Sequence, residues 1–180
     1  MESTRAPLSL FSRRRLLKLG LGAGGALLAS GAGAWAWLRG GAPDVAGLRV
    51  LEPYEHRTLA AIVEVLFPAG SIEGVDVPAL ELPRLFDAFL EGEPEQNVSD
   101  LRDALTYLEL GPLLLERRAA RFSSLPVQER EAHFVSWMTS DDLVRRKIAR
   151  AFRSFFDLVL YDHESVWPFI RYPGPAVGAR

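Results

Sequence analysis

The sequence predicts an all-α protein, a small bundle of about five helices that follows an N-terminal signal or transmembrane helix. Apolar residues recur at three- and four-residue spacing through most of the chain, as on the buried face of a helix. No stretch shows strict two-residue alternation bounded by hairpin turns, so we expect no sheet. The 180 residues are 48% apolar and 24% charged, which is typical of one globular domain.

The chain divides into three expected parts. Residues 1–38 are a basic stretch followed by an uncharged one, and we interpret them as a signal or signal-anchor. Residues 39–52 are rich in glycine and contain Pro43, which indicates a linker. Residues 53–177 carry the helical pattern and form the expected domain, which ends in an extended tail rich in aromatic residues and proline.

The first two expected helices are bounded by proline and glycine. Pro53 begins the first helix, because the missing N–H of proline has no partner in a first turn anyway. Its apolar stripe is Leu59, Ile62, Val63 and Leu66. A second, shorter helix is expected from Ala79 to Leu90. Its inward side chains are expected to be Leu82, Leu85, Phe86 and Phe89.

A third helix is expected to begin at Ser99 as its N-cap. Its buried face is Leu101, Ala104, Leu105 and Leu108. Gly111-Pro112 should kink or split this helix, because proline removes a backbone hydrogen bond in a helix interior. The apolar pattern then resumes at Leu113 and runs to about Phe122.

Pro126 starts the fourth expected helix, whose apolar side is Phe134, Trp137 and Met138. Ser140 is expected to cap the fifth, because serine is a favoured N-cap residue. Acidic residues at Asp141 and Asp142 then suit its positive end. The fifth helix has the most apolar face, formed by Val144, Ile148, Phe152, Phe155, Phe156 and Val159. We therefore expect it to be the central helix of the core.

The N-terminal stretch contains an export motif. The residues that match the pattern Ser/Thr-Arg-Arg-x-Phe-Leu-Lys, with leucine in place of phenylalanine, are Ser12, Arg13, Arg14, Leu16, Leu17 and Lys18. The motif resembles the twin-arginine signal, which implies that the twin-arginine translocase reads Arg13 and Arg14 and carries the chain across the membrane already folded. A general secretory signal or a plain N-terminal anchor is the alternative.

The sequence leaves open whether this signal is removed. The uncharged run Leu19–Leu38 has twenty residues, which at about 1.5 Å each can span a hydrocarbon core of about 30 Å. Trp35 and Trp37 lie where interfacial aromatic residues are found. Small residues at Ala32-Gly33-Ala34 or Ala34-Trp35-Ala36 offer cleavage sites. In both cases we expect the body of the chain in the periplasm or facing it from the inner membrane.

Charge and cysteine content exclude several functions. The chain has no cysteine, which excludes disulfides, iron–sulfur clusters, c-type haem attachment and cysteine nucleophiles. Residues 39–180 carry 16 basic and 22 acidic side chains, a net charge of −6. An acidic body with one basic cluster is a poor nucleic-acid binder, so we expect no nucleic-acid partner.

Little in the sequence points to catalytic chemistry. His56, His133 and His163 stand in no metal-binding pattern. Charged neighbours suggest that His56 and His133 are solvated. No nucleophile elbow is present. We therefore expect no catalytic, cofactor-binding or metal-binding residue in this chain.

Two features are candidate docking surfaces. Arg146, Arg150 and Arg153 share one stripe of the fifth helix, which is either a solvated face or a docking site for an acidic partner. The segment 161–175 holds four aromatic residues and three prolines. It is either an extended strap over the end of the bundle, with Trp167 and Tyr172 as plugs, or a rigid recognition segment.

These features resemble those of the gluconate 2-dehydrogenase subunit 3 family. The matching residues, behind the twin-arginine signal, are Leu51-Glu52-Pro53-Tyr54-Glu55, Phe67-Pro68, and Tyr161 through Trp167 to Tyr172-Pro173-Gly174-Pro175. The similarity spans roughly residues 50–177. The loop after Pro68 departs from the Gly-Ala run that is usual in the family.

The resemblance implies a non-catalytic small subunit. In such systems a large flavoprotein of the glucose–methanol–choline (GMC) type binds FAD and oxidises a sugar, sugar acid or other alcohol, and a c-type cytochrome often takes the electrons. The small subunit supplies the export signal for the folded flavoprotein and is expected to stabilise it. The candidate interface is Trp167, Tyr172, Pro173, Gly174 and Pro175 together with Arg146, Arg150 and Arg153.

Two other functions fit the sequence. One is a stand-alone exported helical protein that binds a partner or ligand without redox chemistry. The other is a small enzyme that uses His163 or His133. A neighbouring gene for a flavoprotein without its own signal is expected only for the accessory subunit.

Overall fold

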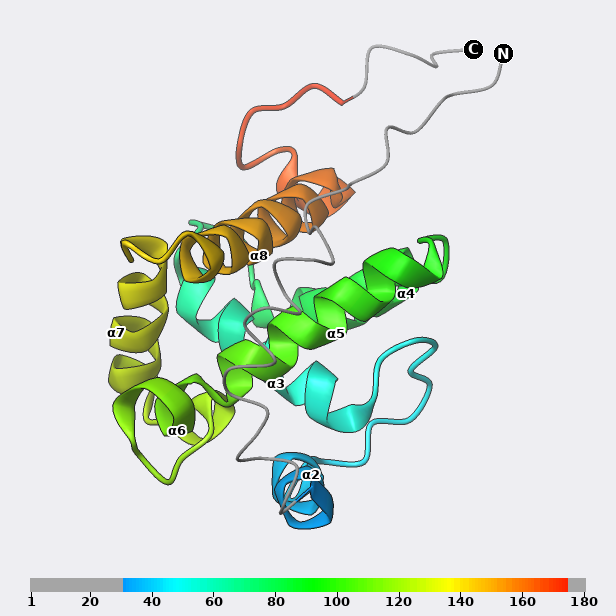
Figure 1. Cartoon of the computed structure of the whole chain (residues 1–180). Helices are drawn as coiled ribbons and strands as arrows, with labels where there is room; N and C mark the ends of the chain where they lie inside the picture. The colour runs from blue at the N-terminus through cyan, green and yellow to red at the C-terminus, as the bar shows by residue number, and fades with distance from the viewer. Residues whose placement is uncertain (1–30, 175–180) are drawn as a thin grey trace.

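The computed structural model describes residues 31–174, with side chains from residue 35 onward. Within this range the regular elements are all helical and no strand is present, which confirms the predicted all-α class for this part of the chain. The α-helices are α2 Gly31–Arg39, α3 Pro53–Leu66, α4 Leu82–Leu90, α5 Glu95–Glu109, α6 Gly111–Glu116, α7 Val127–Met138 and α8 Leu143–Asp162 (Figure 1). Three short 3-10 turns are η2 Pro78–Leu80, η3 Phe122–Ser124 and η4 Glu164–Val166.

Helix α3 is the centre of the fold. Pro53 takes its first position, and the N–H of Glu52 donates to Glu55 Oε2 at 2.7 Å, which holds the first turn. Leu59 and Ile62 of this helix are fully buried. Helices α2, α4, α5, α7 and α8 and the turn η3 all pack against α3. The expectation that the fifth predicted helix is central is therefore wrong.

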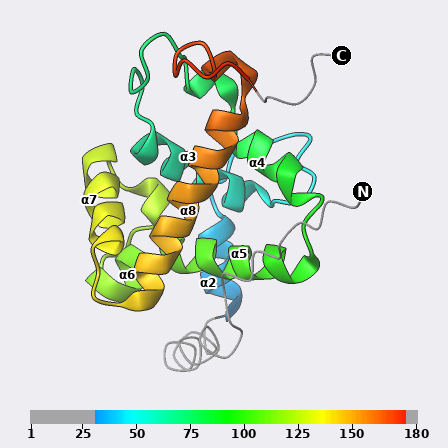
Figure 2. The same cartoon turned by 90° about the horizontal axis from the view of Figure 1, so that it is seen from above.

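Helix α8 instead covers the core along one side (Figure 2). Ile148, Phe152 and Phe156 are buried, as the apolar spacing predicted. The opposite face carries exposed cations such as Lys147 and Arg150. These charges must stay in water, and a helix with such a face cannot be surrounded by other elements.

Two predicted helix starts are shifted in the structure. The N-cap of α8 is Asp142 rather than Ser140, and its Oδ1 accepts from two backbone N–H groups of the first turn at 2.8 and 3.1 Å. Ser140 Oγ accepts from the N–H of Asp142 at 3.1 Å and so stabilises the turn before the helix. Helix α5 begins at Glu95, which leaves Ser99 inside the helix. In both cases a second residue suited to start a helix lies within four positions of the expected one.

The segment expected to be helical from Ala79 is interrupted. The turn η2 is followed by Glu81, which has a left-handed backbone with φ of 47°. Helix α4 then starts one residue before Pro83. Proline is tolerated in a first turn but breaks the hydrogen bonds of a helix interior. Pro83 therefore sets the start of α4.

Gly111-Pro112 separates α5 from α6, as predicted. The apolar pattern after this split does not continue as one helix to Phe122. Helix α6 ends at Glu116, and Arg117 takes a left-handed backbone with φ of 56°. Phe122 reaches the core from the turn η3, where it is fully buried.

The segment 40–52 contains no helix and is tied to α4 through Asp87, which is 3% exposed. The carboxylate of Asp87 accepts the backbone N–H groups of Arg49 at 2.7 Å, Val50 at 3.0 Å and Leu51 at 2.8 Å. Burial raises the pKa of Asp87, but the three backbone hydrogen bonds outweigh it and bring the pKa below its ordinary value. The ionised carboxylate therefore stabilises the fold.

Asp87→Asn is expected to lower the free energy of unfolding by about 1–3 kcal/mol near neutral pH, because an amide cannot accept all three bonds as a carboxylate does. The folded pKa of Asp87 lies below the unfolded value of about 3.9. Its contribution is therefore present above about pH 4 and is lost as the pH falls through both values. Unfolding free energies of wild type and variant, measured from about pH 7 to about pH 2, should converge at the acid end.

The control is Asp76→Asn, at an exposed carboxyl, which should follow the wild type at every pH. Burial raises the pKa of Glu55, so that group favours the folded state as the pH falls, but it is present in all three proteins and cancels in the difference. A difference in unfolding free energy between Asp87→Asn and wild type that stays constant with pH would contradict the assigned role of the Asp87 carboxylate.

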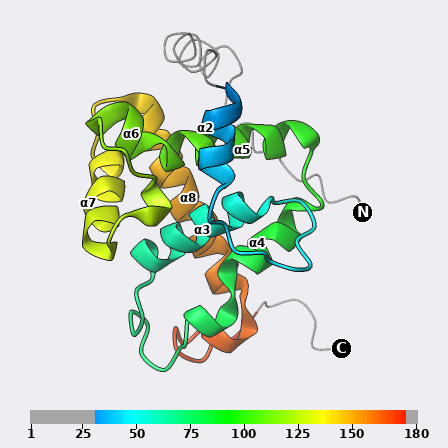
Figure 3. The same ribbon diagram turned by 90° about the horizontal axis from the view of Figure 1, so that it is seen from below.

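The two ends of the described chain lie on opposite sides of the molecule. Helix α2 lies on one side, and the segment that follows α8 lies on the other, as the three views show (Figures 1, 2 and 3). In residues 31–174 we find no helix with the length and apolar character needed to cross a bilayer.

Candidate partner-binding surfaces

The C-terminal segment, residues 161–174, folds back on itself at the end of α8. Trp167 Nε1 donates to the backbone carbonyl of Tyr161 at 2.9 Å, and the N–H of Tyr172 donates to the carbonyl of Trp167 at 2.9 Å. The rings of Trp167 and Tyr172 meet edge to face with centroids 5.5 Å apart. Val166 of η4 is the fully buried side chain of this segment. The expected extended tail is therefore wrong, because these bonds close the segment into turns.

Exposed apolar side chains gather at this end of the molecule. Of the eleven large apolar side chains that are exposed in the described part of the chain, five lie here. They are Leu158, Tyr161, Phe169, Ile170 and Tyr172, and we call them the C-terminal apolar surface. Pro173 beside them is exposed as well, and Gly174 is half-buried. A concentration of exposed apolar groups is typical of an interaction site.

The loop between α3 and α4 supports this surface. A Cβ added to Gly74 would lie 2.1 Å from Cε1 of Phe169, and Gly74 has a φ of +80°. Only glycine allows both the close approach and this backbone conformation. The loop and the C-terminal segment therefore lie side by side, as Figure 3 also shows.

The predicted basic stripe is on α8, but its three members lie in different surroundings. Arg146 donates to the backbone carbonyl of Ser140. Arg153 Nε pairs with the carboxylate of Asp157 at 2.9 Å. Arg150 is exposed and has no ion-pair or hydrogen-bond partner among the residues that the structure describes. Of the three, Arg150 is thus the cation most available to an acidic partner.

Two arginines that the sequence did not single out hold the carboxyl end of α2. Arg57 of α3 donates to the carbonyls of Gly40 at 2.9 Å and Leu38 at 2.7 Å. Arg121 donates to the carbonyl of Trp37 at 2.6 Å, and its guanidinium lies 5.4 Å above the ring of Trp37. Burial and the nearby charge of Arg57 lower the pKa of Arg121. We call Arg57 and Arg121 the arginine clamp.

A buried carboxylate completes the arginine clamp. Glu109 is fully buried, and its Oε1 lies 3.2 Å from Nη2 of Arg57. Ser123 donates to Glu109 twice, from its hydroxyl at 2.5 Å and from its backbone N–H at 3.0 Å. A buried charge is tolerated when it is paired and hydrogen-bonded in this way. The spacing of residues along the sequence could not indicate the arginine clamp, because its members come from α3, α5 and the stretch around η3.

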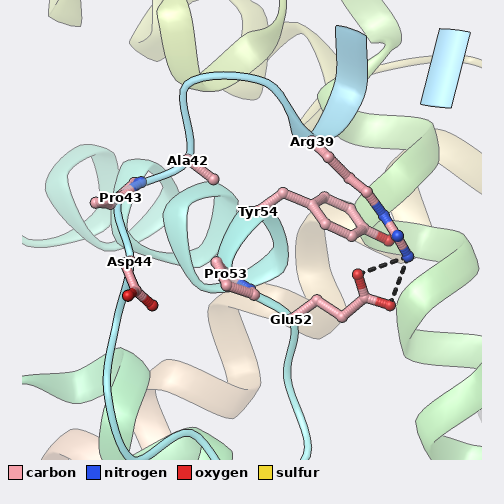
Figure 4. Close-up of a pocket in the computed structure, with 7 residues that line it drawn as sticks. All are labelled: Arg39, Ala42, Pro43, Asp44, Glu52, Pro53 and Tyr54. Atoms are coloured by element: carbon pink, nitrogen blue, oxygen red, sulfur yellow. Dashed lines mark hydrogen bonds and ion pairs between the residues drawn. The ribbon is translucent and has the colours of Figure 1, made fainter. Parts of the chain in front are cut away.

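A cavity of about 290 Å³ lies between the end of α2 and the start of α3 (Figure 4). It is lined by Arg39, Ala42, Pro43, Asp44, Glu52, Pro53 and Tyr54. Arg39 Nη2 reaches across it to both carboxylate oxygens of Glu52, at 2.8 and 2.7 Å. Burial and the charge of Glu55 raise the pKa of Tyr54 to about 12, so this phenol keeps its proton at neutral pH. The lining of the cavity thus contains the ion pair between Arg39 and Glu52 and the neutral phenol of Tyr54.

His133 is not solvated, contrary to the sequence prediction. It is 4% exposed, its Nδ1 lies 2.6 Å from Oε1 of Glu116, and its ring centroid lies 5.6 Å from that of Trp137 and 5.8 Å from that of Phe122. Its Nε2 is buried against Gly111 without a hydrogen-bond partner in the described structure. The ring lies on the buried face of α7, so it packs as a core residue.

The other two histidines lie on different elements. His56 of α3 is half-buried rather than solvated, and burial together with the charge of Arg84 lowers its pKa. His163 follows α8, and its Nδ1 lies 2.8 Å from the hydroxyl of Ser165. Across residues 31–174, no three histidine or acidic side chains are grouped so as to hold a metal ion.

Gly111→Ala is expected to lower the free energy of unfolding by about 1–3 kcal/mol, because overpacking a filled core forces neighbours apart. The added Cβ would lie 2.6 Å from His133 Nε2 and 3.0 Å from Trp137 Cζ2. Chemical denaturation checks this value. Gly92→Ala is the matched control, since a Cβ there meets only one backbone oxygen at 4.0 Å. That control should be neutral or slightly stabilising, and equal losses in both variants would refute the contact.

Some predicted site residues lie outside the described part of the chain. These are Ser12, Arg13, Arg14, Leu16, Leu17 and Lys18 of the export motif and Pro175 of the candidate interface. Comparison with protein-family models, curated proteins and solved structures finds no match to this chain.

Proposed function

We propose that this chain is the accessory subunit of an exported oxidoreductase. It carries a folded FAD-dependent dehydrogenase of the GMC type across the membrane by the twin-arginine route and stabilises it on the periplasmic side. The partner holds FAD and the site for a sugar, sugar acid or other alcohol. A c-type cytochrome subunit takes the electrons where such a subunit is present.

The sequence supports the proposal at both ends of the chain. The motif around Arg13 and Arg14 resembles a signal that delivers folded proteins. The run from Tyr161 to Pro175 carries the residues on which the resemblance to the gluconate 2-dehydrogenase subunit 3 family rests. A signal for folded cargo on a small helical chain is explained if the chain travels with a larger, cofactor-loaded protein.

The observation that carries the proposal is the C-terminal apolar surface. Tyr161, Phe169 and Tyr172 are 45%, 51% and 45% exposed, which in water costs free energy that a partner would recover. Large aromatic side chains held in place by turns also lose little entropy on binding. Arg150, whose side chain is exposed on the same helix that leads to this surface, adds a cation for an acidic group of the partner.

Affinity purification of the full chain, tagged after residue 180, from detergent-solubilised native membranes tests the proposal. We expect a yellow complex with flavin absorbance bands and a second polypeptide of flavoprotein size in fixed ratio to this chain. A colourless chain recovered alone from membranes that contain the dehydrogenase would contradict it.

Two single variants locate the interface in the same purification. Tyr172→Ala should reduce the flavin that copurifies at least several-fold, since aromatic residues dominate interface energetics. Val135→Ala is the control, because Val135 is also an exposed apolar residue, at 50%, but lies on α7. Equal flavin recovery from the two variants would exclude the C-terminal apolar surface as the interface.

A further inference from the structure

The arginine clamp makes the end of α2 part of the folded domain. The last carbonyls of a helix have no partner within it and form the negative end of its dipole. Here Arg57 and Arg121 supply the missing donors to Trp37, Leu38 and Gly40. Two guanidiniums are thereby held close together, and the carbonyls and the carboxylate of Glu109 offset the repulsion between them.

Side-chain packing fixes the same segment to the body. Leu38 is 3% exposed. The ring of Trp35 meets that of Tyr54 edge to face with centroids 6.4 Å apart. The guanidinium of Arg39 lies 5.3 Å from the ring centroid of Trp35 and pairs with Glu52, the N-cap of α3. The end of α2 therefore contacts the domain through apolar, aromatic and charged groups.

Both small-residue cleavage sites lie inside this helix. Ala32-Gly33-Ala34 and Ala34-Trp35-Ala36 fall within Gly31–Arg39. The N–H of Gly40 donates to the carbonyl of Ala36 at 2.8 Å, so the second site is part of the hydrogen-bonded last turn. Proteolytic nicking favours exposed loops and termini. Cleavage here would require that the end of α2 unwind from the domain.

Two aromatic side chains of α2 are exposed, since Trp35 is 50% and Trp37 is 37% exposed. They end the uncharged run Leu19–Leu38 in the sequence, and Arg39 follows directly. Tryptophan next to a cation at the end of a run of about twenty apolar or small residues is typical of the boundary between a bilayer and water.

We propose that the N-terminal segment is not removed, and that α2 holds the folded domain at the membrane surface with Trp35 and Trp37 in the lipid headgroup region. The C-terminal apolar surface lies on the opposite side of the molecule (Figure 1) and so faces away from the membrane, where a partner can reach it. This inference rests on the proposed export of the chain but is independent of the identity of the partner.

The first test is the N-terminus of the exported chain. The full chain, tagged after residue 180, is produced in a host with a functional twin-arginine translocase, and each cell fraction is analysed by intact mass and N-terminal sequencing. We expect the uncut chain of 19.9 kDa, plus the mass of the tag, in the membrane fraction. An alkaline wash should not release it from the membrane, and its folded domain should be accessible from the periplasm. A periplasmic chain that begins at Trp35 or Trp37 would overturn the inference and leave the export proposal standing. A chain confined to the cytoplasm would overturn both.

Arg121→Ala tests the clamp itself, because Arg121 holds only α2 and its own turn, whereas Arg57 also pairs with Glu109. We expect the variant to stay folded, as judged by circular dichroism, and to show at least a several-fold rise in the cleaved fraction. Arg118→Ala is the control, at an exposed arginine of the same stretch that pairs with Glu129, and should remain uncut. Equal processing of the two variants would refute protection by the clamp.

Tryptophan fluorescence tests the lipid contact. The chain has four tryptophans, and in vesicles whose acyl chains carry bromine near the headgroup we expect the full chain to be quenched. Replacing Trp35 and Trp37 by phenylalanine should remove most of that quenching, whereas Trp167→Phe should retain it. Quenching that depends on Trp167 instead would place the membrane contact on the other side of the molecule and overturn the inference.

Discussion

Glu109→Ala is expected to lower the free energy of unfolding by about 3–5 kcal/mol, a large fraction of the total stability of an ordinary domain. The carboxylate is fully buried, pairs with Arg57 at 3.2 Å and accepts two hydrogen bonds from Ser123. Its removal leaves the guanidinium of Arg57, whose side chain is 14% exposed, without its counter-charge. Breaking one side of a buried pair is costly because the remaining charge stays away from water.

The matched control is Glu91→Ala. Its ion pair with Arg49 is shorter, at 2.6 Å, but the two side chains are 57% and 60% exposed. Exposed pairs contribute about 0–1 kcal/mol, because water screens them in both states. In urea denaturation, Glu109→Ala, whose ion pair is buried, should therefore lose more stability than Glu91→Ala, whose ion pair is shorter but exposed. Losses of equal size would show that Glu109 does not act as a buried counter-ion.

Phe86→Ala is expected to cost about 3–5 kcal/mol, the range for a large aromatic residue removed from a core. Phe86 of α4 is fully buried, and its ring centroid lies 5.4 Å from that of Phe156 and 5.6 Å from that of Phe155, both on α8. The cavity left behind would lie between the two helices. Thermal and urea unfolding, followed by circular dichroism, measure the loss.

Phe169→Ala is the control for this substitution. Its ring is 51% exposed and lies over Gly74, so we expect a loss below about 1 kcal/mol, as for surface substitutions in general. If Phe169→Ala cost as much as Phe86→Ala, the C-terminal apolar surface would be part of the core and not a surface for a partner.

Much of the helical architecture follows from local sequence. Proline in the first turn marks the start of α3, Pro126 directly precedes α7 as its N-cap, and Gly111-Pro112 splits α5 from α6. The apolar spacing of α8 identifies Ile148, Phe152 and Phe156 as core residues. These signals work because backbone geometry and side-chain periodicity act within a few residues of each other.

Tertiary contacts decided the remaining features. The burial of His133 depends on Glu116 and Phe122, which other parts of the chain bring to α7. The arginine clamp joins Arg57 and Arg121 to carbonyls that lie 17 to 84 positions away in the sequence. A backbone carbonyl has no signature in a sequence, so an arginine that binds one looks like any other surface arginine.

The conformation of the C-terminal segment also depends on tertiary contacts. Its aromatic residues and prolines indicated a special role, but the Trp167 indole bond to the carbonyl of Tyr161 and the burial of Val166 turn it back on α8. The sequence thus pointed to the segment and named Tyr172, whereas Leu158, Phe169 and Ile170 of the C-terminal apolar surface were not named and its shape could not be predicted.

The proposed role as a signal carrier is tested by locating the partner dehydrogenase in a strain that produces this chain with its export motif disabled. In the double variant Arg13→Lys, Arg14→Lys, the flavoprotein should remain active in the cytoplasmic fraction, and its dye-linked dehydrogenase activity in the periplasmic and membrane-surface fractions should fall to background. The wild-type chain should restore that activity. Normal delivery of the active flavoprotein in the presence of the double variant would contradict the proposal that this chain carries it across the membrane.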